Sequence, residues 1–106
     1  MLVIRGVNVF PSQIEEVLLR IEEIGPHYEI LVERKNRLDV MTISVELIDD
    51  RLLDSYAKLS ELEQSIKASL KSQLGLATQI RLVAPNSLQR FEGKAKRVKD
   101  LRKDGL

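Results

Sequence analysis

One segment near the C-terminal end of the sequence carries residues that could do chemistry, Glu92-Gly93-Lys94-Ala95-Lys96-Arg97-Val98. A glycine before a lysine lets the backbone approach a ligand closely, and the lysine presents a compact, mobile positive charge. Such an ammonium can stabilise negative charge as it develops in a transition state, and losing one preorganised partner of this kind costs on the order of 10²–10³ in rate. On charge alone, a solvated basic terminus is the simpler interpretation. A phosphate-binding P-loop is excluded, because the G-x-x-x-x-G-K-[ST] spacing is absent.

A second unusual segment lies near the N-terminal end, Arg5-Gly6-Val7-Asn8-Val9-Phe10-Pro11. Gly6 and Pro11 bracket a tight connection that contains one buriable aromatic side chain. The segment could be a loop that lines a ligand channel. From composition alone, an ordinary strand-to-helix turn is the better-supported interpretation.

Other kinds of site find little support in the sequence. There is no cysteine, which excludes a disulfide framework, a thiolate nucleophile and a zinc site built on cysteine. The single histidine, His27, cannot form a metal cluster by itself, and we expect no metal site. The chain has two Phe and two Tyr and no [KR]-G-[FY]-[GA]-F run, so no nucleic-acid partner is expected.

The charge is distributed unevenly along the chain. The formal net charge of the 106 residues is +1, but residues 85–106 carry seven basic and three acidic side chains, whereas residues 1–84 carry ten basic and thirteen acidic ones. The sequence therefore predicts a basic C-terminal extension on a domain that is slightly acidic. No apolar run approaches the roughly 18 residues that a membrane span needs. No signal-peptide pattern is present either, so we expect a cytoplasmic protein without a membrane partner.

The elements that would position these segments follow from the spacing of the apolar residues. Residues 2–4 predict a short strand. Pro11 and Ser12, with Glu15 three positions later, predict the start of a helix. That helix should bury an apolar stripe and end at Gly25-Pro26. The stripe consists of Ile14, Val17, Leu18 and Ile21.

The rest of the chain alternates between strand and helix patterns. Residues 28–33 and 41–47 alternate with period two around a polar turn at residues 35–37, which predicts a hairpin with one wet face. Residues 56–74 predict a second helix with Gly75 as its C-cap, and residues 79–83 a last strand. The order predicts an α+β, ferredoxin-like β-α-β-β-α-β domain that spans residues 1–106. We expect an antiparallel sheet with two helices on one face, plus the basic extension.

The two unusual segments together resemble a known family. Residues 5–15 and 92–98 are similar to the corresponding motifs of the C-terminal domain of phenylacetate–coenzyme A ligases, in the adenylate-forming superfamily. The resemblance covers about residues 2–102, and the two motifs lie about eighty residues apart on the predicted frame.

The resemblance implies the C-terminal part of an enzyme that works in two steps. ATP (with Mg²⁺) and an aryl acetate give an acyl-adenylate and pyrophosphate, and coenzyme A then displaces AMP to give the thioester. An N-terminal adenylation domain would hold most of the ATP and acid site, and the small domain would be a lid that rotates between the two half-reactions. Lys94 matches the lysine that reaches the carboxylate and the α-phosphate, and Gly93 precedes it. Arg5, Gly6, Val7 and Asn8 match the loop that borders the pantetheine channel.

The sequence departs from the family in the residues before Lys94. Gln89-Arg90-Phe91 stands where the family often has Pro-Arg-Ser, so the acid specificity cannot be inferred. No nucleotide-binding Gly/Ser loop is present, so the isolated chain is expected to be inactive and to bind neither ATP nor coenzyme A alone.

Two other hypotheses remain open. An ACT-like regulatory domain would have the same element order and bind a small ligand at a homodimer interface, but it leaves Gly93-Lys94 unexplained. A stand-alone interaction protein that docks on a separate adenylation subunit is the third possibility.

Overall fold

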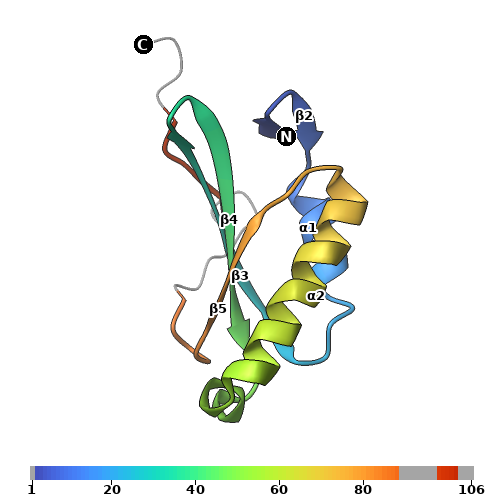
Figure 1. The fold of residues 1–106 in the computed structure, drawn as a ribbon, viewed down its shortest axis with the longest axis vertical. Coiled ribbons are helices and arrows are strands. Elements are labelled where there is room, and N and C mark those ends of the chain that lie inside the picture. Colours follow the sequence, from blue (N-terminus) through green and yellow to red (C-terminus); the bar gives the residue numbers. More distant parts are fainter. Residues whose placement is uncertain (1, 89–97, 103–106) are drawn as a thin grey trace.

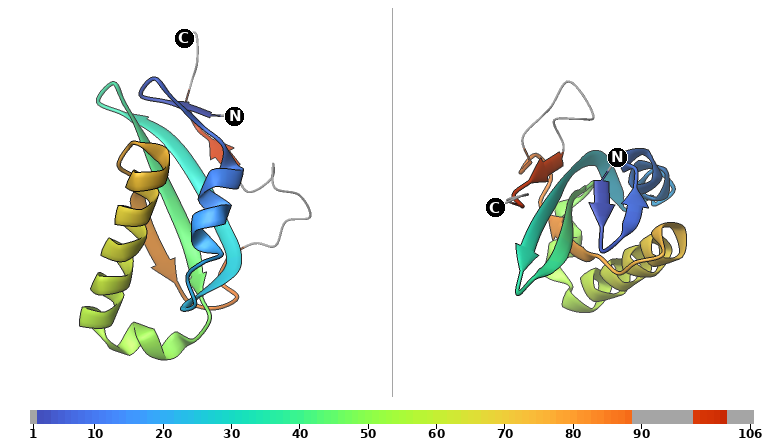
Figure 2. Two further views of the ribbon diagram at one scale, coloured as in Figure 1. Left: turned by 90° about the vertical axis from the view of Figure 1, so that its right-hand side faces the viewer. Right: turned by 90° about the horizontal axis from the view of Figure 1, so that it is seen from above.

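The computed structural model describes residues 2–88 and 98–102 of the chain. A four-stranded sheet is covered on one face by both helices, and a small two-stranded hairpin lies at the end of the sheet where β3 turns into β4 (Figure 1 and Figure 2). In chain order the elements are β1 (Leu2–Ile4), β2 (Val7–Val9), α1 (Pro11–Leu18), β3 (Ile24–Lys35), β4 (Leu38–Leu47), the 3-10 helix η1 (Asp50–Asp54), α2 (Tyr56–Leu74), β5 (Gln79–Val83) and β6 (Val98–Asp100).

The α+β class and the presence of two helices are as predicted, but the sheet is mixed rather than antiparallel. Its order is β5-β4-β3-β6, with β3 and β4 antiparallel and both outer pairs parallel. The parallel β4–β5 pair follows from the crossover through α2, because a helix between two strands returns the chain to its starting end. The ferredoxin-like antiparallel arrangement was therefore the wrong prediction for this sheet.

The N-terminal strand is not part of the main sheet. β1 pairs with β2 through a two-residue turn, in which Arg5 (φ 51°) and Gly6 (φ 79°) both have left-handed conformations. Two consecutive left-handed residues form the tight turn that hairpins favour, so the chain reverses immediately after Ile4. Residues 7–9, which the sequence suggested were a connection, are the partner strand.

Part of the basic extension belongs to the sheet. Val98–Asp100 form β6, an edge strand that pairs with β3 through Ile30, Leu31 and Val32. Only Val98 of this strand packs against the core, so the segment has no alternating pattern by which the sequence could have revealed it.

The first helix begins and ends earlier than predicted. Phe10 is its N-cap residue, Pro11 occupies the first helical position, and the Phe10 N–H donates to Gln13 Oε1 at 2.9 Å. The capping interaction at the start of the helix is therefore between Phe10 and Gln13, and not between Ser12 and Glu15 as predicted. Phe10 itself is 45% exposed, so the aromatic of this segment is not buried.

The predicted helix stop at Gly25-Pro26 lies inside β3. The ladder between β3 and β4 shifts register between Ile24 and Tyr28. A bulge accommodates Pro26, because proline cannot donate a backbone hydrogen bond to the ladder.

The core lies between the sheet and the two helices. It contains the predicted helix stripes and the alternating strand residues, among them Ile14, Val17, Ile30, Val32, Ile43, Val45, Leu62, Ile66, Leu70 and Ile80. Gly75 (φ 81°) forms the expected left-handed C-cap of α2. The alternation in β4 predicted that its opposite face would be exposed to solvent. That prediction was wrong, because Thr42, Ser44 and Glu46 on this face are buried.

None of the helices in residues 2–88 and 98–102 combines the length and the apolar character that crossing a membrane requires.

Candidate functional site

The turn at Arg5-Gly6 is an exposed loop on a buried base. Ile4, the last residue of β1, and Val9, the last residue of β2, are fully buried in the core. Arg5, Gly6 and Asn8 are exposed and Val7 is half-buried. The two-residue turn is therefore fixed at its foot by apolar packing and presents its tip to solvent.

A glycine is needed at position 6 because of its backbone conformation, and not because neighbouring atoms of the domain leave no room for a side chain. Its φ of 79° lies in the left-handed region, and a Cβ built on it would meet nothing within 4 Å. The space beside Gly6 is thus open, so a ligand chain could pass there without a side chain in its way.

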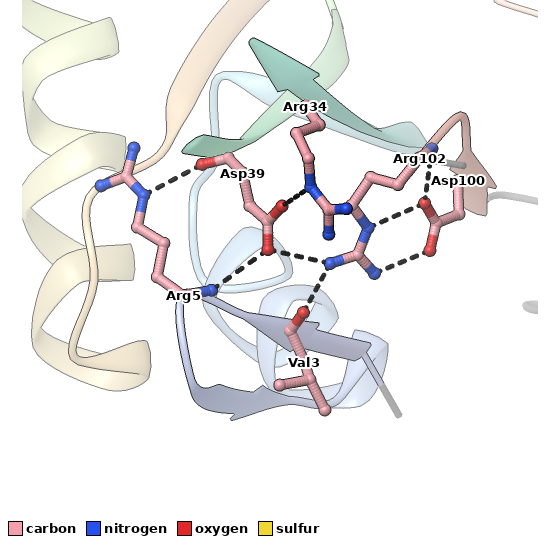
Figure 3. Close-up of polar contacts among 6 residues, drawn as sticks. All are labelled: Val3, Arg5, Arg34, Asp39, Asp100 and Arg102. Atoms are coloured by element: carbon pink, nitrogen blue, oxygen red, sulfur yellow. Dashed lines mark hydrogen bonds and ion pairs between the residues drawn. The ribbon is translucent and has the colours of Figure 1, made fainter. Parts of the chain in front are cut away.

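Asp39, at the start of β4, holds the turn from the side. The Arg5 Nε–H donates to the Asp39 carbonyl oxygen at 2.9 Å, and the Arg5 backbone N–H lies 3.4 Å from Asp39 Oδ2 (Figure 3). The other carboxylate oxygen, Oδ1, accepts from Arg34 Nε at 3.0 Å. Desolvation acts to raise the pKa of Asp39, but the hydrogen bonds from Arg34, Arg5 and Arg102 outweigh it and hold the pKa below its ordinary value.

Arg102 joins three elements at the same place. Its Nη1–H donates to the Val3 carbonyl oxygen at 2.6 Å and to Asp39 Oδ2 at 3.1 Å (Figure 3). Its Nε and Nη2 bind the two oxygens of Asp100 at 2.9 and 2.7 Å. The side chain is only 8% exposed. The side-chain hydrogen bond that Arg102 donates to Asp100 is the main reason why the pKa of Arg102 is raised, and the same bond lowers the pKa of Asp100.

A surface hollow of about 530 Å³ lies beside the turn. Its lining comes from the β1–β2 turn and the β3–β4 hairpin, and consists of Arg5, Arg34, Arg37, Leu38 and Asp39. Three guanidinium groups against one carboxylate make this side of the turn cationic, which suits an anionic group.

The other predicted site residues, Gly93 and Lys94, lie outside the described residues. The structure does describe both ends of the segment that contains them. On one side, Glu46 accepts hydrogen bonds from the backbone N–H groups of Asn86 and Leu88. On the other side, β6 begins at Val98, and two residues after this strand Arg102 contacts β1.

Sequence reasoning did not find Asp39, Asp100 or Arg102. In the sequence, Arg102 is one of seven basic residues in the extension, and Asp39 belongs to no motif. Their partners lie up to 99 positions away, so no local spacing could have indicated the contacts. The described residues contain no group of His, Asp and Glu that could hold a metal ion, and His27 is half-buried in the bulge of β3.

The AMP-binding enzyme C-terminal domain family has a model that matches residues 6–102. The chain belongs to this family. It resembles the phenylacetate–coenzyme A ligase of Escherichia coli, with 41% identity over 96% of this chain and 23% of the relative. The ligase of Thermus thermophilus is 38% identical over 97% of this chain and 26% of its own length. The chain thus spans about a quarter of these ligases.

Solved structures of the family have the same fold as this chain. A domain of phenylacetate–coenzyme A ligase from Bacteroides vulgatus is 38% identical, with a TM-score of 0.87, and the match covers 98% of this chain and 94% of that domain. The 2-hydroxyisobutyryl-CoA ligase in complex with 2-HIB-AMP and CoA, in the thioesterification state, is 31% identical with a TM-score of 0.82 over 92% of this chain and 20% of that one. The same ligase in the postadenylation state gives a TM-score of 0.80 over 96% of this chain and 22% of that one. This family member therefore has the fold of the present chain at both stages.

Proposed function

We propose that this chain is the mobile lid of a phenylacetate–coenzyme A ligase, which converts ATP, an aryl acid and coenzyme A into AMP, pyrophosphate and the acyl thioester. One observation carries the proposal. The chain matches a phenylacetate–coenzyme A ligase domain over nearly the whole length of both, with a TM-score of 0.87. The enzyme's partner domain would be the N-terminal adenylation domain.

Lys94 is the residue proposed to act in the first half-reaction. A carboxylate oxygen of the acid attacks the α-phosphorus of ATP, and the bond to the pyrophosphate leaving group breaks. Negative charge that spreads over the carboxylate and the α-phosphate would be stabilised by the lysine ammonium, and Gly93 would allow the backbone to come close. Support comes from the Glu92-Gly93-Lys94 motif.

The turn Arg5-Gly6-Val7-Asn8 is proposed to act in the second half-reaction. The thiolate of coenzyme A attacks the carbonyl carbon of the acyl-adenylate, and the bond to AMP breaks. The turn would border the channel through which pantetheine reaches that carbon. An exposed turn on a buried base, with open space at Gly6, supports this role.

The ACT-like alternative loses its basis in the fold. It was based on a β-α-β-β-α-β element order, whereas the observed chain begins with a separate β1–β2 hairpin and adds β6 to a mixed four-stranded sheet. No observation favours a ligand site at a dimer interface within the described part of the chain.

Complementation tests the proposal. This chain is mixed with a separately expressed N-terminal adenylation domain, and ATP, phenylacetate and coenzyme A are supplied while AMP and thioester are measured. We expect neither domain alone to make thioester and the mixture to make it, with the adenylation step lost in Lys94→Ala. A mixture that stays inactive at saturating concentrations of both domains would count against the lid assignment.

A further inference from the structure

Arg102 and Arg51 share a local motif but differ in what they hold. In Asp100-Leu101-Arg102 and in Asp49-Asp50-Arg51, the arginine backbone N–H and Nε–H both donate to the aspartate two positions earlier. The Arg51 side chain is 87% exposed, and in the described part of the chain its hydrogen bonds and ion pair go to Asp49 alone. The Arg102 side chain is 8% exposed and also reaches Val3 and Asp39. These tertiary contacts are therefore an addition to the local motif and not a consequence of it.

The tertiary contacts add directed hydrogen bonds to a hairpin that is otherwise held by apolar packing. Among the described residues, no backbone hydrogen bond joins the β1–β2 hairpin to the four-stranded sheet. Ile4 and Val9 are fully buried and Leu2 and Val7 pack against the core, so apolar packing anchors the hairpin, but this non-directional packing does not by itself set the orientation of the exposed turn. Directed, charge-assisted hydrogen bonds do, and here they come from Arg102 to the Val3 carbonyl and between Asp39 and Arg5.

β6, in contrast, does not depend on the Arg102 side chain. It pairs with β3 along its length, and the Leu101 N–H donates to the Val32 carbonyl at 2.8 Å. Lys99 forms an ion pair with Glu29 at 3.1 Å. Removing the guanidinium should therefore release the hairpin while the strand that follows the Lys94 segment stays in place.

We propose that Arg102, together with Asp39, is a positioning residue for thioester formation, because it sets the orientation of the turn Arg5-Gly6-Val7-Asn8. The inference rests on the proposed function of that turn. Arg102 itself would touch no substrate. Its effect is carried through the Val3 carbonyl and the Asp39 carboxylate, which together fix the strand and the turn that border the channel.

The test separates the two half-reactions in the ligase formed from this chain and its adenylation domain. Adenylation is followed by exchange of labelled pyrophosphate into ATP, and thioester formation is followed after acyl-adenylate has accumulated and coenzyme A is added. In Arg102→Ala we expect the thioester rate to fall at least about tenfold, since losing a buried charge-assisted bond shifts the turn, with adenylation nearly unchanged. Arg102→Lys and Asp39→Asn should show the same selective loss to a smaller extent, because each keeps some of the contacts. Arg51→Ala, which removes the same local motif without tertiary contacts, should resemble wild type.

A purely structural role gives a different result. If Arg102 only stabilises the fold, both rates fall together in proportion to the fraction of folded protein, which circular dichroism measures in the same samples. That outcome, or an Arg102→Ala thioester rate equal to that of Arg51→Ala, would overturn the proposal. Should Arg102→Ala fail to fold, Arg102→Lys and Asp39→Asn decide the question.

Two further variants separate this inference from the proposed function. Lys94→Ala should lose adenylation, and Gly6→Val should lose thioester formation. If neither half-reaction responds to its variant, the lid assignment itself fails. If both respond and the Arg102 variants do not show the selective loss, only the positioning role fails.

Discussion

The buried carboxylate of Glu46 accepts a hydrogen bond from the backbone N–H of Leu88 at 2.9 Å. A second comes from the Asn86 N–H at 3.0 Å, and Glu46 is only 3% exposed. Val45 and Leu47 face the helices, so Glu46 projects from the opposite face of β4. This acidic side chain therefore fixes the chain just before the segment that contains Lys94.

Replacing Glu46 by Gln should weaken both bonds, because a neutral amide oxygen accepts less strongly than a carboxylate. We expect the free energy of unfolding to fall by about 1–2 kcal/mol. In the complemented ligase, adenylation should fall more than thioester formation, the reverse of the pattern expected for Arg102. Urea unfolding and the two half-reaction assays check this. Glu16→Gln, which removes an exposed pair with Arg20, is the matched control. Equal stability of the two variants would contradict the role of Glu46.

Lys94→Ala should reduce the adenylation rate by about 10²–10³, the usual cost of losing one preorganised electrostatic partner of the transition state. Thioester formation from preformed acyl-adenylate should change little, because the lysine is proposed to act only in the first step. Pyrophosphate exchange and a single-turnover thioester assay measure the two rates. Lys58→Ala, at the exposed start of α2, is the control for losing one lysine charge. Comparable adenylation rates in the two variants would argue against Lys94 as the catalytic residue.

Gly6→Ala should cost stability through its backbone alone. Its φ is 79° and a Cβ would meet nothing within 4 Å, so the expected loss is about 1 kcal/mol from the left-handed conformation. Gly75, with φ 81° and equally open surroundings, provides a control with the same strain at the end of α2. The two alanine variants should have similar urea midpoints, but only Gly6→Ala should slow thioester formation. A similar slowing in Gly75→Ala would show that the effect is one of stability.

The stability of the domain should depend on pH through Asp39 and Asp100. Both have pKa values below the ordinary 3.8 in the folded protein, so the unfolded chain binds more protons in this range. The stabilisation is therefore fully present above the unfolded pKa and is lost as the pH falls through the lower folded values. Urea unfolding between about pH 6 and pH 2.5 should show this decline, with a shallower slope in Asp39→Asn. An unchanged slope in that variant would mean that Asp39 contributes nothing to the acid sensitivity.

The sequence by itself determined the features that depend on neighbouring residues. The apolar stripes of α1 and α2, the period of two in β3 and β4, and the glycine that ends α2 all reflect local periodicity or backbone conformation. The family also followed from sequence, because its two motifs are contiguous strings that need no folding to be read. The boundaries of the elements did not follow from the sequence in the same way. Helix α1 begins at Pro11, earlier than predicted, and Gly25-Pro26 lies in a bulge of β3 instead of at the end of a helix.

The tertiary structure decided what depends on residues far apart in the chain. β1 turns back on β2 because Arg5 and Gly6 both adopt left-handed conformations. The sequence indicates such a conformation only for the glycine, because an arginine rarely adopts it. β6 joins the sheet with one apolar side chain, too few to form a pattern. The contact between Arg102 and Val3 spans 99 positions, and nothing in either residue's neighbourhood distinguishes this arginine from Arg51, which carries the same local motif. Ile4 and Val9 are buried in the core and Val98 packs against it, which brings the end of the basic segment to the N-terminal turn and leaves the polar neighbours of these residues side by side.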